Sequence, residues 1–413
     1  MKTSLKKPKQ AVILCGGLGS RLRPYTLSNP KPMILCNEKP FIWYLMNQMS
    51  EKGISNFILL TGYLSQKIKD YFGNGDSFGW CIEYSSGPVE WDTGRRLWEA
   101  KKLLEESFIL LYSDNFAPFL FDQLIETHNK NNLPLTLTVV EKKPGNLSLS
   151  NSGIVEKYDT DRIDGRSNYV EIGYMVVQTK FMFDYFIDPD CSFSTVIKSL
   201  ANSKKIGTWI QNDTYHSISD PIRWKMAEKY LEAKKIIFID RDGVINQKAK
   251  KGEYITNWKN FKFIPDTINV MKQLSIEGFQ FIIITNQAGI ARGKMNYNDL
   301  NKIHNNLLNE FKKYGIKILK IYTCPHHWDE NCNCRKPKPG MFYSASRDFN
   351  IRLDKTLFIG DDLRDCEAAF NAGVKSIFLG DSSKLTSLED KKKPIFSSIK
   401  LSSILPNILD YFN

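Results

Sequence analysis

Short apolar segments, rich in β-branched and aromatic residues, alternate with amphipathic stretches along the whole chain of 413 residues. In the first half, this pattern predicts a helix over residues 40–52 and strands over residues 11–14, 57–61, 108–112 and 135–140. In the second half, it predicts strands over residues 235–239, 281–284, 318–322, 357–359 and 376–379. Such alternation is typical of parallel sheets covered by helices, so we expect an α/β fold.

The length and the distribution of motifs indicate two domains, at residues 1–232 and 233–413. We expect both of them to be doubly wound α/β domains. Residues 221–234 have a helical pattern and run into the strand at residue 235 without a Gly, Ser or Pro spacer. This continuity predicts a stiff junction near residue 233.

The formal net charge is +12, and most of the positive charges are Lys residues scattered among Asn, Asp and Glu. We interpret this as a solvated lysine-rich surface, with a field that attracts small anionic substrates as the alternative. Nucleic acid is not an expected partner, because no zinc-finger, ribonucleoprotein or helix-turn-helix pattern accompanies the charge. No apolar run approaches the roughly 18 residues that span a bilayer, and the start lacks a signal-peptide pattern. We therefore expect a cytoplasmic protein without a membrane partner.

A glycine-rich segment follows the first expected strand, with Gly16, Gly17 and Gly19 before Arg21, and Lys31 between two prolines. Glycines let a backbone approach a phosphate closely, and the two cations would neutralise a triphosphate. The pattern Gly-Gly-x-Gly-x-Arg-Leu, followed by Pro-Lys-Pro, resembles the signature of the sugar-1-phosphate nucleotidyltransferases. The resemblance implies a Rossmann-like domain in which a sugar 1-phosphate attacks the α-phosphorus of a nucleoside triphosphate, with Arg21 and Lys31 as catalytic residues.

The same resemblance assigns further positions in this domain. Thr93 and Gly94 stand where the family contacts the nucleotide. Their stretch has an Arg-Leu ending that is similar to cytidylyl-transferring members, so the base stays open between guanine, cytosine and others. Gly173 matches the glycine of a sugar-contacting turn, and Asp114 ends a strand where the family binds Mg²⁺.

The second metal ligand of this domain has two possible positions. Many members of the family carry Asp-Ile-Gly-Thr-Pro, whereas this chain reads Ser-Ile-Ser-Asp-Pro over residues 217–221. One alignment places Ser217 at the ligand position, and another places Asp220 there. We take Asp220 as the candidate ligand. If neither residue binds the metal, the domain would turn over slowly or only bind its nucleotide.

In the second half, polar motifs stand where expected strands end, which is where open α/β sheets build their sites. Two aspartates separated by one residue can act as a nucleophile on phosphorus and as a proton donor to the leaving oxygen. The positions are Asp240, Asp242, Thr285, Asn286, Arg335, Lys336, Asp361 and Asp362. In this order they resemble the motifs of the haloacid dehalogenase phosphohydrolases, which implies a second domain of that fold.

This resemblance implies a role for each position. Asp240 would be the nucleophile that forms an aspartyl-phosphate, and Asp242 would be the general acid and base. The residues that hold the substrate would be Thr285, Asn286 and Lys336. The residues that hold Mg²⁺ would be Asp240, Asp242 through its backbone carbonyl, Asp361 and Asp362.

Three cysteines and two histidines fall within residues 324–334. Thiolates and an imidazole suit tetrahedral zinc, and the natural ligands are Cys324, His326, Cys332 and Cys334. Because no position would remain open for water, we expect a structural Zn²⁺ that holds the substrate loop ahead of Arg335. Disulfides are the alternative, which a cytoplasmic location disfavours.

The Cys/His loop and the motifs around it narrow the resemblance to a smaller group within the phosphohydrolases. Asp-Arg-Asp-Gly, Thr-Asn-Gln-Ala-Gly-Ile-Ala-Arg-Gly, Cys-x-His and Cys-x-Cys-Arg-Lys-Pro are similar to the D-glycero-D-manno-heptose 1,7-bisphosphate phosphatases, with histidinol-phosphate phosphatases as the nearest relatives. Arg292, together with Arg335, would bind the second phosphate that a bisphosphate substrate carries.

The fusion of these two domains constrains both assignments, because the phosphatase would make the sugar 1-phosphate that the nucleotidyltransferase consumes. The resemblance implies a bifunctional enzyme that makes a nucleotide-activated heptose, with GMP as the transferred group. Two alternatives stay open. One is a histidinol-phosphate phosphatase fused to a sugar nucleotidyltransferase, and the other is a phosphatase with a non-catalytic nucleotide-binding module. The oligomeric state is not readable from the sequence.

Overall fold

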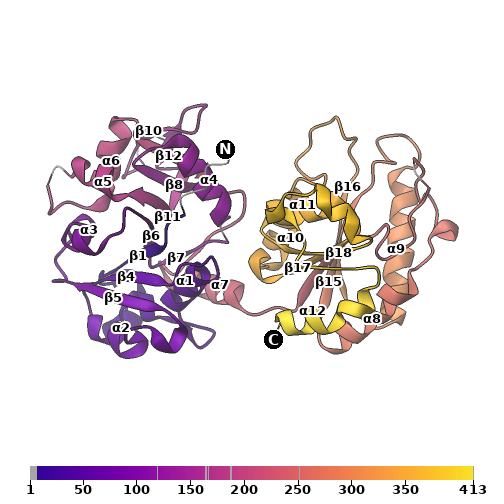
Figure 1. Cartoon of the computed structure of the whole chain (residues 1–413), viewed down its shortest axis with the longest axis horizontal. Helices are drawn as coiled ribbons and strands as arrows, with labels where there is room; N and C mark the ends of the chain where they lie inside the picture. Colours follow the sequence, from indigo (N-terminus) through magenta and orange to yellow (C-terminus); the bar gives the residue numbers. More distant parts are fainter. Residues whose placement is uncertain are drawn as a thin grey trace. The chain divides into compact units, whose positions relative to one another are not determined.

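A computed structural model describes residues 7–118, 120–162, 165, 167–186, 188–250 and 252–412, except for the side chain of Phe181. The molecule consists of two compact units, one up to Glu232 and one from Ala233 onward (Figure 1). Among the described residues, no helix is both long enough and apolar enough to cross a membrane.

The N-terminal unit is built on a nine-stranded mixed sheet. Four of its strands run parallel with β1 near the centre, and they are β1 (Gln10–Cys15), β4 (Asn56–Thr61), β5 (Cys81–Ser86) and β6 (Ser107–Tyr112). The long strand β11 (Tyr169–Gln178) is antiparallel to β6 and to β8 (Leu135–Glu141). The remaining strands are β9 (Leu147–Leu149), β10 (Val155–Tyr158) and β12 (Ile206–Ile210). The expected parallel strands are present, and the antiparallel β11 was not anticipated, because a fully buried strand has the same apolar pattern in either direction.

Alternation along β1 gives this sheet two apolar faces. Ala11 and Ile13 belong to one hydrophobic core, whereas Val12 and Leu14 belong to the other. Residues of α1, α2, α4 and α7 line the first core, and residues of α3 and α6 line the second. Their bounds are α1 (Phe41–Ser50), α2 (Ser65–Phe72), α3 (Thr93–Glu99), α4 (Phe121–Asn131), α5 (Thr179–Met182), α6 (Phe193–Asn202) and α7 (Pro221–Leu231). Helices therefore cover both faces of the sheet.

Two short strand pairs complete the unit. One joins β2 (Leu35–Cys36) to β3 (Lys39–Pro40), and the other joins β7 (Asn115–Phe116) to β13 (His216–Ser217). The second pair brings the segment before α7 against the residues that follow Asp114, because Ile218 donates its backbone N–H to the carbonyl of Asp114 at 2.9 Å.

The C-terminal unit contains a six-stranded sheet in the order β16-β15-β14-β17-β18-β19. All of its strand pairs are parallel. The strands are β14 (Ile236–Ile239), β15 (Gln280–Asn286), β16 (Ile318–Cys324), β17 (Leu357–Gly360), β18 (Lys375–Leu379) and β19 (Phe396–Ser398). The five strands expected in this half are all present, and β19 is an addition at the edge.

Helices cover both faces of this sheet as well (Figure 1). The helices are α8 (Pro265–Ile276), α9 (Tyr297–Lys313), α10 (Gly340–Phe349), α11 (Leu363–Ala372) and α12 (Leu405–Phe412). Ile237 and Ile239 pack in a core with residues of α8, α9 and α12, whereas Phe238 packs with residues of α10 and α11. Because parallel strands end at one edge of the sheet, the loops after β14, β15 and β17 meet there.

The segment between the units differs from the expected continuous helix. Helix α7 ends at Leu231, and Glu232 has non-helical backbone angles of φ −59° and ψ 133°. Strand β14 begins only at Ile236, so residues 232–235 lie between the two elements. The interpretation of a helix that runs straight into the strand is therefore wrong.

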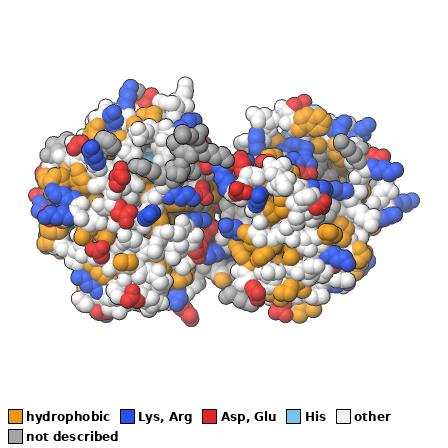
Figure 2. Space-filling view, viewed as in Figure 1, with side chains coloured by type: hydrophobic (Ala, Val, Ile, Leu, Met, Phe, Trp, Pro, Cys, Tyr) orange, Lys and Arg blue, Asp and Glu red, His pale blue; other side chains and the backbone are white. Residues whose placement is uncertain are grey.

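Charged side chains of both signs are interspersed over the face shown in Figure 2. Several of the Lys residues form ion pairs with nearby carboxylates, such as Lys225 with Glu228 and Lys313 with Glu310. This distribution favours the interpretation of a solvated lysine-rich surface.

Candidate active sites

A cavity of about 410 Å³ opens beside the glycine segment that follows β1. Seven of the residues expected from the sequence line it, namely Gly16, Gly17, Gly19, Arg21, Lys31, Thr93 and Asp114. Gly19 has φ +63°, and a Cβ there would lie 2.9 Å from the side chain of Lys31. The left-handed backbone and this close approach both require glycine at position 19.

Lys31 and Asp114 form an ion pair across this cavity, with Lys31 Nζ 2.5 Å from Asp114 Oδ2. Both side chains are partly buried, with 14% and 25% of their surface exposed. A cation and a carboxylate in one cavity suit a nucleoside triphosphate and its divalent ion. The cation would neutralise the triphosphate, and the carboxylate would bind the divalent ion. The N-terminal site therefore contains the charges that nucleotidyl transfer needs.

Neither Asp220 nor Ser217, the two possible positions of a second metal ligand, lines this cavity. Asp220 caps the N-terminus of α7, where its side chain accepts a hydrogen bond from the backbone of Arg223 at 2.9 Å. Ser217 is buried, and its hydroxyl lies 3.1 Å from that of Ser219. Of these residues, only Ser219 lines the cavity. The structure thus places Ser219 beside Asp114 in the cavity lining and leaves Asp220 outside it.

Gly94 and Gly173 also lie outside the cavity lining. Gly94 is buried, and a Cβ there would lie 2.4 Å from the carbonyl oxygen of Cys191, so it permits close packing of the backbone. Gly173 has φ +77° at a break in the β11 ladder, and a Cβ there would lie 2.7 Å from Tyr112. Tyr112 lines the cavity, so Gly173 packs against a cavity-lining ring without lining the cavity itself.

Sequence reasoning missed the structural role of Arg96. Its guanidinium is buried and donates hydrogen bonds to the carbonyls of Thr61 at 2.8 Å, Pro88 at 2.7 Å and Gly16 at 3.4 Å. Arg96 therefore joins the glycine segment to the end of β4 and to the loop before α3. In the sequence Arg96 stands in the Arg-Leu ending of the Thr93 stretch, which does not reveal that its side chain turns inward.

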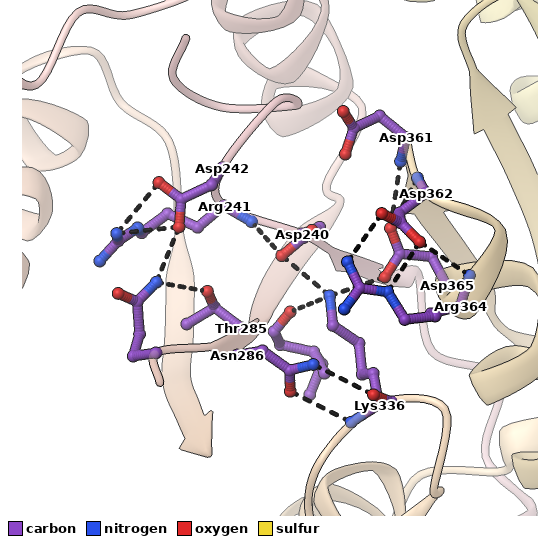
Figure 3. Close-up of polar contacts among 12 residues, drawn as sticks. Asp240, Arg241, Asp242, Thr285, Asn286, Lys336, Asp361, Asp362, Arg364 and Asp365 are labelled. Atoms are coloured by element: carbon purple, nitrogen blue, oxygen red, sulfur yellow. Dashed lines mark hydrogen bonds and ion pairs between the residues drawn. The ribbon is translucent and has the colours of Figure 1, made fainter. Parts of the chain in front are cut away.

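In the C-terminal unit, Asp240, Thr285 and Lys336 line a cavity of about 110 Å³ at the carboxyl edge of the sheet. Lys336 Nζ lies 2.9 Å from Asp240 Oδ1 and 2.7 Å from Asp365 Oδ1 (Figure 3). Asn286 exchanges two hydrogen bonds of 3.1 Å with the backbone of Lys336. The loop after β16 is thereby tied to the end of β15, which presents the Lys336 ammonium group to Asp240.

Three carboxylates gather at this edge. Oxygen atoms of Asp240, Asp361 and Asp365 all lie within 4.8 Å of one another. Asp361 Oδ1 is buried and has no hydrogen-bond partner among the described residues, while its other oxygen lies 2.7 Å from Lys248 Nζ. A buried carboxylate oxygen without a donor suits a hard cation such as Mg²⁺. The donor set present therefore fits the expected metal.

Asp365 lies in this cluster, whereas Asp362, which the sequence suggested as a ligand, does not. Asp362 caps α11 and forms a bidentate ion pair with Arg364, at 2.9 and 2.8 Å. Asp365 accepts hydrogen bonds from the backbone N–H groups of Asp361 and Asp362, both at 3.1 Å. The signal that could have found it is its spacing, since Asp365 follows Asp361 by one helical turn.

Asp242 lies in the same cavity but is held by donors from three residues. Its oxygens accept hydrogen bonds from Arg241 at 3.0 Å, Asn246 at 2.9 Å and Gln287 at 2.7 Å. Burial raises the pKa of Asp242, but the Arg241 guanidinium and these hydrogen bonds outweigh burial and lower it overall. The resting side chain is therefore a carboxylate, ready to accept a proton.

The Cys/His residues also come together. The Sγ atoms of Cys324, Cys332 and Cys334 and Nδ1 of His326 lie within 4.8 Å of one another. Three thiols and one imidazole are a donor set that suits a structural zinc ion. Arg335 donates a hydrogen bond to the backbone carbonyl of His326 at 3.2 Å, so the cluster supports a residue of the substrate loop.

Arg292 is not among the described residues that line the cavity at Asp240 or a neighbouring cavity that Trp328 and Arg335 line. It donates a hydrogen bond to the hydroxyl of Tyr254 at 3.1 Å, and its guanidinium lies 5.3 Å from the ring centre of Trp328. These aromatic contacts hold it at an exposed position. Trp328 lines the same cavity as Arg335, so Arg292 contacts a residue of that cavity without being one of its lining residues.

Comparisons with known proteins agree with this division into two units. A family model described as nucleotidyl transferase matches residues 10–165, and one described as polynucleotide kinase 3 phosphatase matches residues 235–392. A Campylobacter jejuni D-glycero-α-D-manno-heptose-1,7-bisphosphate 7-phosphatase is 39% identical over 150 residues, which cover 36% of this chain and 84% of that protein. The Haemophilus ducreyi β-heptose enzyme is 35% identical over 184 residues, covering 42% of this chain and 98% of that protein.

Solved structures similar to this chain fall into the same two groups. A D,D-heptose 1,7-bisphosphate phosphatase from B. bronchiseptica, complexed with magnesium and phosphate, is 29% identical and has a TM-score of 0.40, covering 43% of this chain and 98% of that one. HddC from Yersinia pseudotuberculosis, complexed with GMP-PN, is 22% identical and has a TM-score of 0.45, covering 54% of this chain and 100% of that one. Through its C-terminal unit, the chain belongs to the D-glycero-D-manno-heptose-1,7-bisphosphate 7-phosphatase family, and it is an enzyme that also carries an N-terminal nucleotidyl transferase domain.

Proposed function

We propose that this protein catalyses two consecutive steps in the synthesis of a nucleotide-activated heptose. The C-terminal unit removes the 7-phosphate from D-glycero-D-manno-heptose 1,7-bisphosphate. The N-terminal unit then transfers a nucleotidyl group to the resulting sugar 1-phosphate and releases pyrophosphate. The observation that carries this proposal is the fusion itself, because one chain joins a heptose bisphosphatase-family unit to a nucleotidyl transferase unit, which would use a sugar 1-phosphate such as the product of that reaction.

In the phosphatase step, Asp240 attacks the phosphorus of the 7-phosphate, and the bond to the sugar oxygen breaks. Asp242 gives a proton to the leaving oxygen and then takes one from the water that hydrolyses the aspartyl-phosphate. Lys336 neutralises the phosphoryl oxygens, and its ion pair with Asp240 at 2.9 Å places it at the reacting carboxylate. Asp240, Asp361 and Asp365 would hold Mg²⁺, whose charge lets an anionic carboxylate approach an anionic phosphate.

Because Asp242 is held as a carboxylate by Arg241, it must acquire a proton before it can act as an acid. The reacting phosphate group of the substrate is an anion next to Asp242, and its negative charge raises the pKa of Asp242 and so favours a proton there. Thr285 lies in the same cavity and is oriented by Gln287, whose side chain donates to its hydroxyl at 2.9 Å. The Thr285 hydroxyl is thereby available to bind a phosphoryl oxygen.

In the transfer step, a phosphate oxygen of the sugar 1-phosphate attacks the α-phosphorus, and the bond to pyrophosphate breaks. No enzyme-bound covalent intermediate is required, so positioning and neutralisation of charge supply the catalysis. Arg21 and Lys31 line the cavity and neutralise the triphosphate, while Asp114 would hold Mg²⁺ against the phosphates. Gly16 and Gly17 let the backbone approach them closely.

For the transferred group we propose GMP, in keeping with the heptose assignment, and CMP is the alternative that the Thr93 stretch favours. A nucleotide-binding module without catalysis is a second candidate function for the N-terminal unit. The specific observation behind it is that Asp220 caps α7 and does not line the cavity. Among the described residues, the carboxylates that do line it are Asp114 and Asp92, and Asp92 caps the start of α3.

The test gives the purified protein Mg²⁺, one nucleoside triphosphate at a time and either anomer of D-glycero-D-manno-heptose 1,7-bisphosphate. We expect phosphate in every reaction with the preferred anomer and pyrophosphate with GTP alone. Pyrophosphate with another nucleotide would replace GMP in the proposal. Phosphate without any pyrophosphate would make the N-terminal unit a binding module, and phosphate from histidinol phosphate alone would overturn the heptose assignment.

A further inference from the structure

A second cavity, of about 360 Å³, lies beside the catalytic cavity of the C-terminal unit. The two cavities share the side chains of Lys336 and Arg364 in their linings. Because these two residues border both spaces, a substrate whose reacting phosphate lies at Asp240 can extend directly into the second cavity. A volume of this size is within the range of small-molecule sites.

The lining of the second cavity is strongly cationic. Arg335, Lys336, Lys338 and Arg364 contribute to it, and no Asp or Glu is among the described residues that line it. This composition contrasts with the catalytic cavity, which four carboxylates line. Lys336 and Arg364 are ion-paired with carboxylates outside this lining, so the net positive charge of the cavity comes mainly from Arg335 and Lys338. Such a lining attracts an anion, and a phosphate offers the largest compact charge in a sugar bisphosphate.

The cations are held in place by neighbouring groups. Lys338 donates hydrogen bonds to the backbone and the side chain of Asn331. Arg364 lies in the first turn of α11, where Nε and Nη2 bond to the two oxygens of Asp362. Figure 3 shows this pair next to Lys336. Nη1 of Arg364 takes no part in the pair, and a guanidinium fixed in this way is preorganised to bind phosphate.

We propose that this second cavity binds the phosphate that the enzyme does not remove, with Arg364 as the residue that selects a bisphosphate over a monophosphate. The inference rests on the proposed phosphatase function and adds the site of the spectator phosphate. Arg364 lines the same cavity as Arg335, whereas Arg292, the partner expected from the sequence, lies against Tyr254 and the cavity-lining Trp328 and is not itself a lining residue. Lys338 completes the site from the loop that carries the Cys/His cluster.

The experiment compares two substrates that differ only in the spectator phosphate, D-glycero-D-manno-heptose 1,7-bisphosphate and the 7-phosphate of the same sugar. Wild-type enzyme is expected to prefer the bisphosphate. In Arg364→Gln the KM for the bisphosphate should rise at least about tenfold, since a charge-assisted hydrogen bond is lost, and the preference should fall by a similar factor. Lys338→Gln, which alters the second cavity alone, should lower the preference in the same direction.

Arg347→Gln is the matched control, because Arg347 is an exposed arginine on α10 that bonds to Ser344. It should retain the wild-type preference. Equal losses with both substrates in Arg364→Gln and Lys338→Gln would overturn this inference, because those residues would then serve folding or chemistry. Phosphate release from neither sugar by the wild-type protein would instead overturn the proposed function on which the inference rests.

Discussion

The ammonium group of Lys336 lies 2.9 Å from Oδ1 of Asp240, and both side chains are buried. Burial raises the pKa of Asp240 to about 7, while the charge of Lys336 acts in the opposite direction and favours the carboxylate. A carboxylate must be ionised to attack phosphorus, so this ion pair supports the nucleophilic role proposed for Asp240. It also places the phosphate-binding cation next to the atom that reacts.

Asp240→Asn should lower phosphate release from heptose 1,7-bisphosphate at least about a thousandfold, because an amide cannot form the aspartyl-phosphate. Nucleotidyl transfer to heptose 1-phosphate supplied directly should persist at the wild-type rate. Parallel assays of phosphate and pyrophosphate test both expectations. Asp348→Asn, at an exposed aspartate paired with Lys320, is the control. Loss of both activities in folded Asp240→Asn protein would contradict two independent sites.

Asp114→Asn should reduce pyrophosphate release at least about a hundredfold, because the cavity would lose the carboxylate that is proposed to hold the metal. Asp220→Asn should reduce it much less, since asparagine can replace aspartate as the cap of α7. Steady-state assays at saturating Mg²⁺ compare the two variants. Equal losses would restore Asp220 as the second metal ligand that the sequence suggested.

Cys332→Ser should remove bound zinc, because a hydroxyl is a poor substitute for a thiolate in a tetrahedral site. Metal analysis of the purified variant measures this directly, and a lower unfolding temperature of the C-terminal unit should accompany the loss. Cys81→Ser changes an exposed cysteine of the N-terminal unit and serves as the control. Zinc content equal to that of the wild type in Cys332→Ser would contradict the ligand set.

Arg96→Met should destabilise the N-terminal unit by about 3 kcal/mol, because the buried carbonyls of Thr61 and Gly16 and the part-buried carbonyl of Pro88 would lose a charged donor. Urea denaturation followed by tryptophan fluorescence suits this test, since Trp43, Trp80, Trp91, Trp98, Trp209 and Trp224 all lie in that unit. Arg95→Met alters the neighbouring arginine, which pairs with Glu99 and Asp190 near the surface, and should cost much less. An equal effect of the two substitutions would contradict the special role of Arg96.

The stability of the N-terminal unit should fall as the pH decreases from about 6.5 to about 4. Burial lowers the pKa of His128 to about 4, so over this range the unfolded state takes up a proton that the folded state does not. The effect reaches up to about 3 kcal/mol for this histidine. Urea titrations at pH 7.5 and pH 5 measure it.

His128→Gln should reduce this pH dependence without abolishing it. Glutamine keeps a polar group near Thr136, which His128 Nδ1 contacts at 2.8 Å, but it does not titrate. His216 would remain, and burial lowers its pKa to about 4 as well. An unchanged difference between pH 7.5 and pH 5 in His128→Gln would show that His128 is not the neutral buried group described here.

Local sequence was enough to predict the elements that carry the phosphatase site. The strands before Asp240, Thr285 and Asp361 are short, apolar and rich in Ile and Phe, and parallel strands must end at one edge. The Cys/His spacing likewise predicted a cluster, which the structure brings within 4.8 Å. The direction of β11 was not predictable, because its apolar pattern does not distinguish a parallel from an antiparallel neighbour.

The sequence by itself determined the order of strands and helices, the glycine segment after β1 and the residue types available at each strand end. These follow from local preferences and short-range spacing. Only the tertiary structure decided that Asp365 joins the carboxylate cluster, that Asp220 caps a helix, and that Arg364 borders two cavities. Such choices depend on which elements become neighbours in the folded sheet and on competing partners for each charge, and neither is encoded in spacing along the sequence.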